Sequence, residues 1–359
     1  MLANTLSKFI VAMATVFIST LPAQAQDHAA LASRYAPVHH QVTDETRAQS
    51  DYIAAVNYDS DWVATNNWDN LGEGLWPATV YYSVVESTTH WFISYGFYHP
   101  QDWGLGGSAR EHENDMHGVI MSVRKDAQPL GTLEGMLTVG DNENFFSYVP
   151  AGSPYKAKPG GETIDGAIEF SSNTSQLRPK TAASSKHHGV KAWSLGEVAG
   201  KSVVVYYPTG GAAEYPTSHN DSQVPYQLVD ILARGGLWSA ALIDIPRDSK
   251  GDTFVSFGRF SGDATGGCGR RSKKCPTNQG LAPWGWDDHD DGATYGGEWV
   301  LDPASLFAFY FDGIGDFGRN YVDNRFLSYL RDSGYSTAKP PAGLNGNIKL
   351  DALYEKLLP

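Results

Sequence analysis

The segment EHENDMHG, residues 111–118, concentrates the side chains of this chain that are best suited to chemistry. Six of its first seven residues carry a carboxylate, an amide or an imidazole. The apolar run VIMSV at 119–123 follows directly and is typical of a β-strand. Carboxylate oxygens and imidazole nitrogens at one end of a strand are the ligands that hard and borderline divalent cations require. The segment therefore predicts a metal site.

The spacing of the two histidines decides which kind of site this is. On a helix, His112 and His117 would point roughly 140° apart, so the H-E-x-x-H zinc protease motif is excluded. On a strand, side chains alternate between faces, so Asp115 and His117 share one face and His112 must come from a loop or a bulge. Asp102 lies at the end of the preceding apolar run, across a hairpin.

We therefore predict that one cation binds Asp102, His112, Asp115 and His117. A mixed oxygen and nitrogen site of this kind suits Mg²⁺, Ca²⁺, Mn²⁺ or Zn²⁺, and the residue types do not choose among them. The alternative is a solvated hairpin loop without a metal.

The same residues carry a resemblance to a known family. FYHPQDW followed by EHENDMHGVIMSV resembles the centre of the necrosis-inducing (necrosis- and ethylene-inducing peptide-like) proteins, where a strand ending W-Y-F-P-K-D precedes G-H-R-H-D-W-E. It is also similar to the related vacuolar sorting-associated family and its bacterial secreted relatives. Asp102, His112 and Asp115 fall on the aspartate, histidine and aspartate of the motif. His117 replaces its glutamate and Met116 its tryptophan, so this site would carry one negative charge fewer.

This resemblance implies both a fold and a function. It implies a mainly β protein, a lectin-like β-sandwich with a few peripheral helices. In the necrosis-inducing proteins these positions hold a divalent cation, and the surface around it binds sphingolipid head groups. The expected function is cation-dependent binding of a sugar or lipid head group, with peripheral contact to a membrane. The segments 34–37 (RYAP) and 282–288 (APWGWDD) resemble the vacuolar sorting-associated family more than the necrosis-inducing proteins.

A metal-dependent hydrolase of a phosphodiester or glycoside is the alternative function. In that case the metal would activate water, and His117, His188 or Glu113 would act as the base. His188 belongs to a second histidine element, KHHGV at 186–190, which resembles a histidine-glycine element of the same superfamily and is expected to line the same cleft. An exposed pair of loop histidines is the simpler interpretation of that element.

The acidic, tryptophan-rich segment 283–299 is a second candidate site. Counted from Asp287, it places Asp291 at position 5 and Glu298 at position 12, as in an EF-hand calcium loop. Position 3 is His289, and the flanks do not read as helices. A second calcium loop, a solvated acidic turn and a sugar site therefore stay open. In the sugar site Trp284 and Trp286 would stack on a pyranose, although both also fit a protein core. The candidates for ligand binding are therefore Glu113 and His188 from the two histidine segments, and Trp284 and Trp286 from this acidic segment.

The beginning of the chain predicts export. Lys8, the apolar run FIVAMATVFISTL and the A-x-A pattern ending at Ala25 form a secretory signal over 1–25. Cys268 and Cys275 are the two cysteines of the chain, and an exported protein permits a disulfide between them. We expect a secreted or periplasmic protein.

Composition and patterning bound the remaining possibilities. The formal net charge is −13, which argues against nonspecific binding to nucleic acid and against a polybasic grip on lipid. Short runs rich in β-branched and aromatic residues, each bounded by turn residues, predict one β-sandwich domain over 26–359, with a long loop near 151–166. The runs are 78–85, 90–98, 118–123, 201–207 and 252–260; helices are expected at 226–236 and 348–358, and a helix or buried strand at 304–311.

Overall fold

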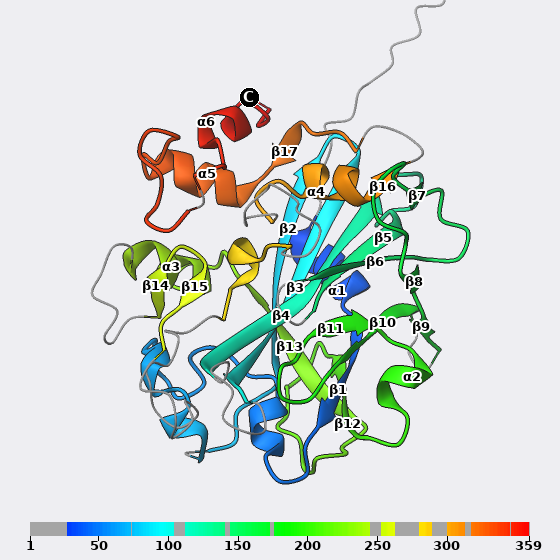
Figure 1. Cartoon of the computed structure of the whole chain (residues 1–359), viewed down its shortest axis with the longest axis vertical. Helices are drawn as coiled ribbons and strands as arrows, with labels where there is room; N and C mark the ends of the chain where they lie inside the picture. Colours follow the sequence, from blue (N-terminus) through cyan, green and yellow to red (C-terminus); the bar gives the residue numbers. More distant parts are fainter. Residues whose placement is uncertain are drawn as a thin grey trace, which may run out of the picture.

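The computed structural model shows a mainly β protein with a few short helices, as the sequence predicts (Figure 1). It describes residues 27–72, 74–103, 112–140, 144–172, 176–244, 253–262, 280–288, 300–312, 317–344 and 346–358. The predicted signal segment 1–25 and both cysteines lie outside these residues, as do Asp291 and Glu298 of the acidic segment. Within the described ranges, no helix is long and apolar enough to cross a membrane.

Four long antiparallel strands form the centre of the molecule. They are β2 (Thr79–Ser87), β3 (His90–Asp102), β4 (His112–Arg124) and β5 (Thr132–Val139). All thirteen residues of β3 are buried. Both faces of these strands are therefore covered, and this explains why their sequences read as continuous apolar runs rather than as a clean alternation.

These strands belong to a sheet of thirteen, in the order β11-β10-β1-β12-β13-β2-β3-β4-β5-β6-β8, with β17 and β9 paired off this path. The remaining members are β1 (Val38–Thr43), β6 (Phe145–Val149), β8 (Gly166–Ala167), β9 (Phe170–Ser171), β10 (Arg178–Ala183), β11 (Val190–Ala192), β12 (Ser202–Pro208), β13 (Val224–Asp230) and β17 (Tyr321–Asp323). Two small sheets pair β7 (Lys156–Ala157) with β16 (Phe311–Asp312), and β14 (Phe254–Ser256) with β15 (Arg259–Phe260).

The large sheet curls back on itself. β11 stands at one end of the strand order, yet it contacts β4 and β5 near the other end. In Figure 1, β10 and β11 accordingly lie beside the lower part of β4. Continuous strand pairing links the two halves of this curl. The structure therefore shows a mainly β fold, and the lectin-like sandwich stays a prediction. The curl matters for the candidate site, because it brings the β10–β11 turn to the polar ends of β3 and β4.

Short helices cover the sheet and its edges. The α-helices are α1 (His28–Tyr35), α2 (Leu195–Val198), α3 (Leu237–Asp244), α4 (Pro303–Tyr310), α5 (Arg325–Asp332) and α6 (Leu350–Tyr354). The 3₁₀ turns are η1 (Ala48–Asp51), η2 (Ala64–Asn66), η3 (Asp69–Gly72) and η5 (Pro283–Gly285). Helix α1 begins after Asp27, whose carboxylate accepts hydrogen bonds from the backbone of Ala29 and Ala30, as an N-cap should.

Four sequence predictions of local structure can be compared with the observed elements. The helix expected at 226–236 is wrong, because its first half is strand β13, paired in parallel with β2 and β12. The run 252–260 forms two short strands in place of one. The segment 304–311 is helix α4, whose Phe307 packs on Phe92 of β3 with ring centroids 5.5 Å apart. The long loop near 151–166 contains only the two-residue strand β7 before it reaches β8.

Candidate functional site

The predicted metal ligands lie where β3 and β4 pair. Asp102 is directly opposite His112, and Asp115 is opposite His99. His112 is part of β4 rather than of a loop, but the backbone between it and Asp115 is irregular. Asn114 has a φ of 57°, a left-handed conformation that asparagine tolerates better than most residues. Its side chain is held by hydrogen bonds to the backbone carbonyls of Ala64 and Ser261.

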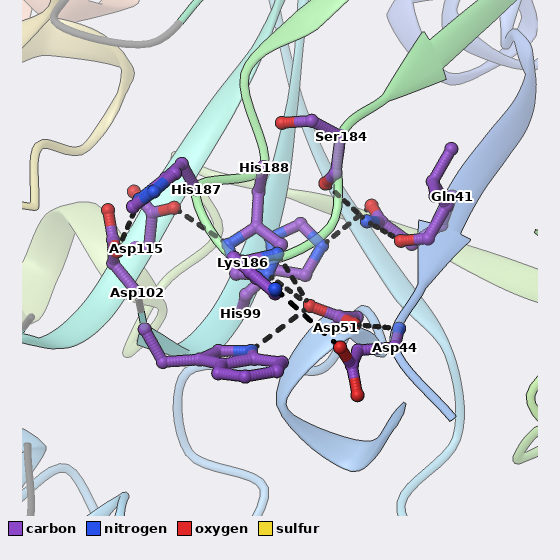
Figure 2. Close-up of polar contacts among 12 residues, drawn as sticks. Gln41, Asp44, Asp51, His99, Asp102, Asp115, Ser184, Lys186, His187 and His188 are labelled. Carbon is purple, nitrogen blue, oxygen red and sulfur yellow. Dashed lines mark hydrogen bonds and ion pairs between the residues drawn. The ribbon is translucent and has the colours of Figure 1, made fainter. Parts of the chain in front are cut away.

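A buried histidine joins two carboxylates at the centre of the site (Figure 2). His188 Nδ1 lies 2.8 Å from Asp115 Oδ2, and His188 Nε2 lies 3.1 Å from Asp51 Oδ1. Burial alone would lower the pKa of His188, but hydrogen bonds and charges from Asp115 and Asp51 outweigh it and raise that pKa to about 10. His188 is therefore an imidazolium that donates from both ring nitrogens.

Asp115 is the charge partner of two histidines. Besides His188, it faces His117, whose Nδ1 is 3.2 Å from Asp115 Oδ1. Burial would raise the pKa of Asp115, but the two histidines outweigh burial and hold that pKa well below its usual range. Asp115 is thus ionised, and its negative charge is balanced inside the protein.

Asp51 is a functional-site residue that the sequence did not reveal. It ends η1, a turn that contacts both β1 and β3. Besides His188, its carboxylate accepts hydrogen bonds from Trp103 Nε1 at 3.2 Å, from the Lys186 backbone at 2.9 Å and from the Asp44 backbone at 2.7 Å. No motif surrounds Asp51 in the sequence, so only its contacts in the folded chain could identify it.

Neutral histidines extend the network into the core. The ring of His99 stacks on that of His188, with centroids 3.8 Å apart and an interplanar angle of 6°. Gln41 Oε1 links His99 Nε2 at 3.1 Å to His39 Nε2 at 3.4 Å. Burial lowers the pKa of His39 to about 3 and that of His99 well below its ordinary value. Both rings are therefore neutral, and only His188 in this stack is charged.

A second carboxylate with two histidines lies closer to solvent. Asp102 Oδ1 is 2.8 Å from His187 Nδ1, and Asp102 Oδ2 is 3.7 Å from His112 Nε2. The His187 side chain is 39% exposed and that of Asp102 12%, against 0% for His188. This outer centre, Asp102 with His112 and His187, is therefore accessible to a ligand. In the inner centre, Asp115, His188 and Asp51 are enclosed, while the His117 side chain keeps 11% exposure.

The β10–β11 turn joins the two centres, because His187 and His188 are neighbours in the chain and serve one centre each. Lys186 and His188 have φ values of 78° and 53°, which are uncommon for residues other than glycine. The Trp103 backbone N–H donates to the Lys186 carbonyl at 2.9 Å and fixes the turn against the end of β3. The strained turn is thus held by contacts on both sides.

The structure divides the four predicted ligands into two pairs. It brings Asp102 to His112 and Asp115 to His117, and it adds His187 to the first pair and His188 to the second. No three histidine, cysteine or acidic side chains of the described residues are arranged to hold a metal ion. The donor chemistry of the outer centre, one carboxylate and two imidazoles, does suit a borderline divalent cation. Cation binding by the four residues stays a prediction.

The other ligand-binding candidates are all buried, including Glu113. His188 is enclosed, so it supports the site without lining a cleft. Trp284 packs edge-on against Trp238 at 5.0 Å, and Trp286 Nε1 donates to the Met116 carbonyl at 2.9 Å. Both tryptophans are core residues, so the expectation that a pyranose stacks on them is not met. Asp287 accepts from its neighbour's backbone N–H, while the rest of the predicted calcium loop lies outside the described residues.

Comparisons with known proteins give only distant matches. No protein-family model matches the chain, and no curated protein does. Solved structures that match include "Toxin fold for microbial attack and plant defense" (13% identity, 61% of this chain and 80% of that one, TM-score 0.32). "NLPPya in complex with mannosamine" matches at 18% (57% and 75%, TM-score 0.28). Necrosis and Ethylene inducing Protein 2 from the causal agent of cocoa's Witches Broom disease matches at 15% (49% and 72%, TM-score 0.26).

Necrosis- and ethylene-inducing proteins are therefore among the structural neighbours of this chain, at identities and TM-scores too low to say anything about its site. The vacuolar sorting part of the sequence resemblance stays a prediction.

Proposed function

We propose that this chain is a secreted protein that binds a sugar or lipid head group through a divalent cation, on a lectin-like β scaffold. The observation that carries the proposal is the outer centre. A carboxylate at the solvent boundary, Asp102, lies 2.8 Å from one imidazole and 3.7 Å from another. Oxygen and nitrogen donors from two strands and a strained turn lie near one another there, and this supports a binding site over a solvated loop.

In this proposal Asp102 and His112 bind the cation, and His187 joins them. His187 now hydrogen-bonds to Asp102, so the cation must compete with that bond and with protonation of the imidazole. A cation bound by so few protein ligands keeps coordination positions for hydroxyl or phosphate oxygens of a head group. Mg²⁺, Ca²⁺, Mn²⁺ and Zn²⁺ remain the candidates, and of these two imidazoles favour Zn²⁺.

The inner centre has a different part in the proposal. Asp115 and His117 supply the remaining predicted ligands, but Asp115 is already balanced by His188. We infer that these residues mainly fix the end of β4, so that His112 keeps its place opposite Asp102. A preorganised outer centre loses less conformational entropy when it binds its cation.

A metal-dependent hydrolase is the second candidate, and the pair of Asp115 and His117 favours it. A carboxylate 3.2 Å from a slightly exposed imidazole is the arrangement that orients a general base. His188 cannot be that base, because it is fully enclosed and both its nitrogens already donate. Release of product from a panel of phosphodiesters and glycosides, dependent on the metal, would favour this second function over binding.

The decisive experiment is calorimetric titration of the mature protein with each cation, followed by glycan-array and vesicle binding with and without chelator. Asp102→Asn should weaken cation binding at least tenfold and should abolish chelator-sensitive head-group binding. Asp332→Asn is the matched control, because it removes one carboxylate from an exposed helix end. If Asp102→Asn binds cation as tightly as the control does, the proposed site is wrong.

A further inference from the structure

A groove of about 610 Å³ opens at the opposite end of the β3–β4 ladder from the histidines. Its walls come from the end of α1, the β4–β5 turn, the β6–β7 loop and the segment around Phe170 and Leu177. The volume falls in the range of small-molecule binding sites. None of the candidate site residues described above lines this groove, so its chemistry is independent of theirs.

A buried carboxylate orients an exposed guanidinium group in this groove. Glu134 Oε1 lies 2.6 Å from Arg124 Nε, and Glu134 Oε2 lies 3.4 Å from His90 Nε2. The Glu134 side chain is 2% exposed, whereas that of Arg124 is 44% exposed. The acidic partner is therefore enclosed, and the guanidinium that it holds faces accessible space. Fixing an arginine in this way reduces the entropy lost when it binds an anion.

A second guanidinium lines the same groove. Arg34 Nη1 donates to the Leu177 carbonyl at 2.9 Å, and its guanidinium lies over the Tyr35 ring, 5.1 Å from the ring centroid. Among the lining residues of the described chain, two arginines thus face a single acid, Glu134. Asp126 borders the groove and accepts a hydrogen bond from the lining residue Thr132, so the two oriented guanidinium groups, rather than a net positive charge, favour an anionic ligand.

We propose that this groove binds a sugar that carries a carboxylate group. A carboxylate matches the planar fork of Arg124 and accepts two parallel hydrogen bonds from it. The apolar face of a sugar ring suits the exposed Leu177, which is 61% exposed, and the half-buried Phe170 beside it. The exposed Gln128 amide provides both a donor and an acceptor for hydroxyl groups. The protein would then bind acidic saccharide here without any cation.

Titration of the mature protein with a short oligomer of uronic acid, in the presence of chelator, tests this proposal. The chelator removes any contribution of the cation site, so the result is separate from the proposed function. We expect saturable binding of the uronate oligomer, and binding at least tenfold weaker for the uncharged oligomer of the same sugar. Equal affinity for the two oligomers, or no binding of the uronate, would overturn the proposal.

Variants then locate the binding. Arg34→Gln and Arg124→Gln should each weaken uronate binding about tenfold, because each removes one charged hydrogen-bonding group. Arg124→Lys keeps a partner for the buried Glu134, so it guards against a simple loss of folding, and it should still weaken binding because an ammonium lacks the planar fork. Arg331→Gln removes an exposed arginine elsewhere and should bind as the wild type does. Folded Arg34→Gln and Arg124→Lys proteins that both bind as the control would refute the assignment.

Discussion

The two ends of the β3–β4 ladder each pair a carboxylate with basic side chains, but the bases differ in kind. At the histidine end, Asp102 faces the imidazoles of His112 and His187, a side-chain type that can bind a metal in its neutral form. At the groove end, Glu134 has a longer contact with the buried His90, at 3.4 Å, but its exposed partner is Arg124 at 2.6 Å, whose charge does not change with pH. In our two proposals, one end exchanges protons for a cation, while the other offers a permanent positive charge to an anion. The same ladder would then support two opposite kinds of recognition.

Replacing His188 should have the largest effect on the stability of the histidine end. His188→Ala leaves Asp51 and Asp115 buried without their shared partner, so we expect the free energy of unfolding to fall by about 3–5 kcal/mol. Urea denaturation measures this loss. His187→Ala is the matched control, because the neighbouring side chain is partly exposed and should cost less than about 1 kcal/mol. Equal stability of the two variants would show that the inner centre is not a buried ion network.

Lowering the pH should reduce the stability of the histidine end, because some of its imidazole rings are neutral in the folded protein. The pKa of His39 is lowered to about 3 in the folded state, below the unfolded value near 6.5. His39 therefore takes up a proton in the unfolded chain but stays neutral in the folded protein. The free energy of unfolding falls as the pH drops below 6.5. Between pH 6.5 and 4.5 this residue alone should remove about 2–3 kcal/mol.

His40, with a pKa lowered to about 4, adds a loss of the same sign. Denaturant titrations across this pH range check the slope, and His39→Gln should make it shallower. A variant whose slope equals that of the wild type would contradict the folded-state pKa of His39.

The smallest expected effect concerns the choice of cation. His117→Glu adds a negative charge to the inner centre, at the position where the resembled motif has its carboxylate. Charge attraction alone should then tighten binding of Mg²⁺ or Ca²⁺ at the outer centre by up to about tenfold, roughly 1.4 kcal/mol. Without a cation the new side chain would face Asp115 with like charge, so the metal-free variant should be less stable than the wild type. Calorimetric titration decides this, with His117→Gln as the uncharged control. Unchanged affinity in the glutamate variant would show that the charge of the inner centre does not act on the bound cation.

The sequence predicted the long strands because their runs of β-branched and aromatic residues are unambiguous. It also predicted that Asp102 and His112 would be near each other, since a hairpin joins their strands. It could not predict the bond from His188 to Asp51, because these residues are 137 positions apart and meet only where the sheet curls. The helix expected at 226–236 failed for a related reason, because pairing with β2 and β12 outweighed local preference.

The neighbouring histidines of the β10–β11 turn also set a rule for recognising relatives of this protein. Because His187 serves the outer centre and His188 the inner one, inserting or deleting a residue just before Gly189 would put the wrong side chain in both. A true relative should therefore keep this turn at constant length, together with an aspartate that plays the part of Asp51. Such a pattern is sparse, yet it would separate proteins that share the site from those that share only a curled sheet.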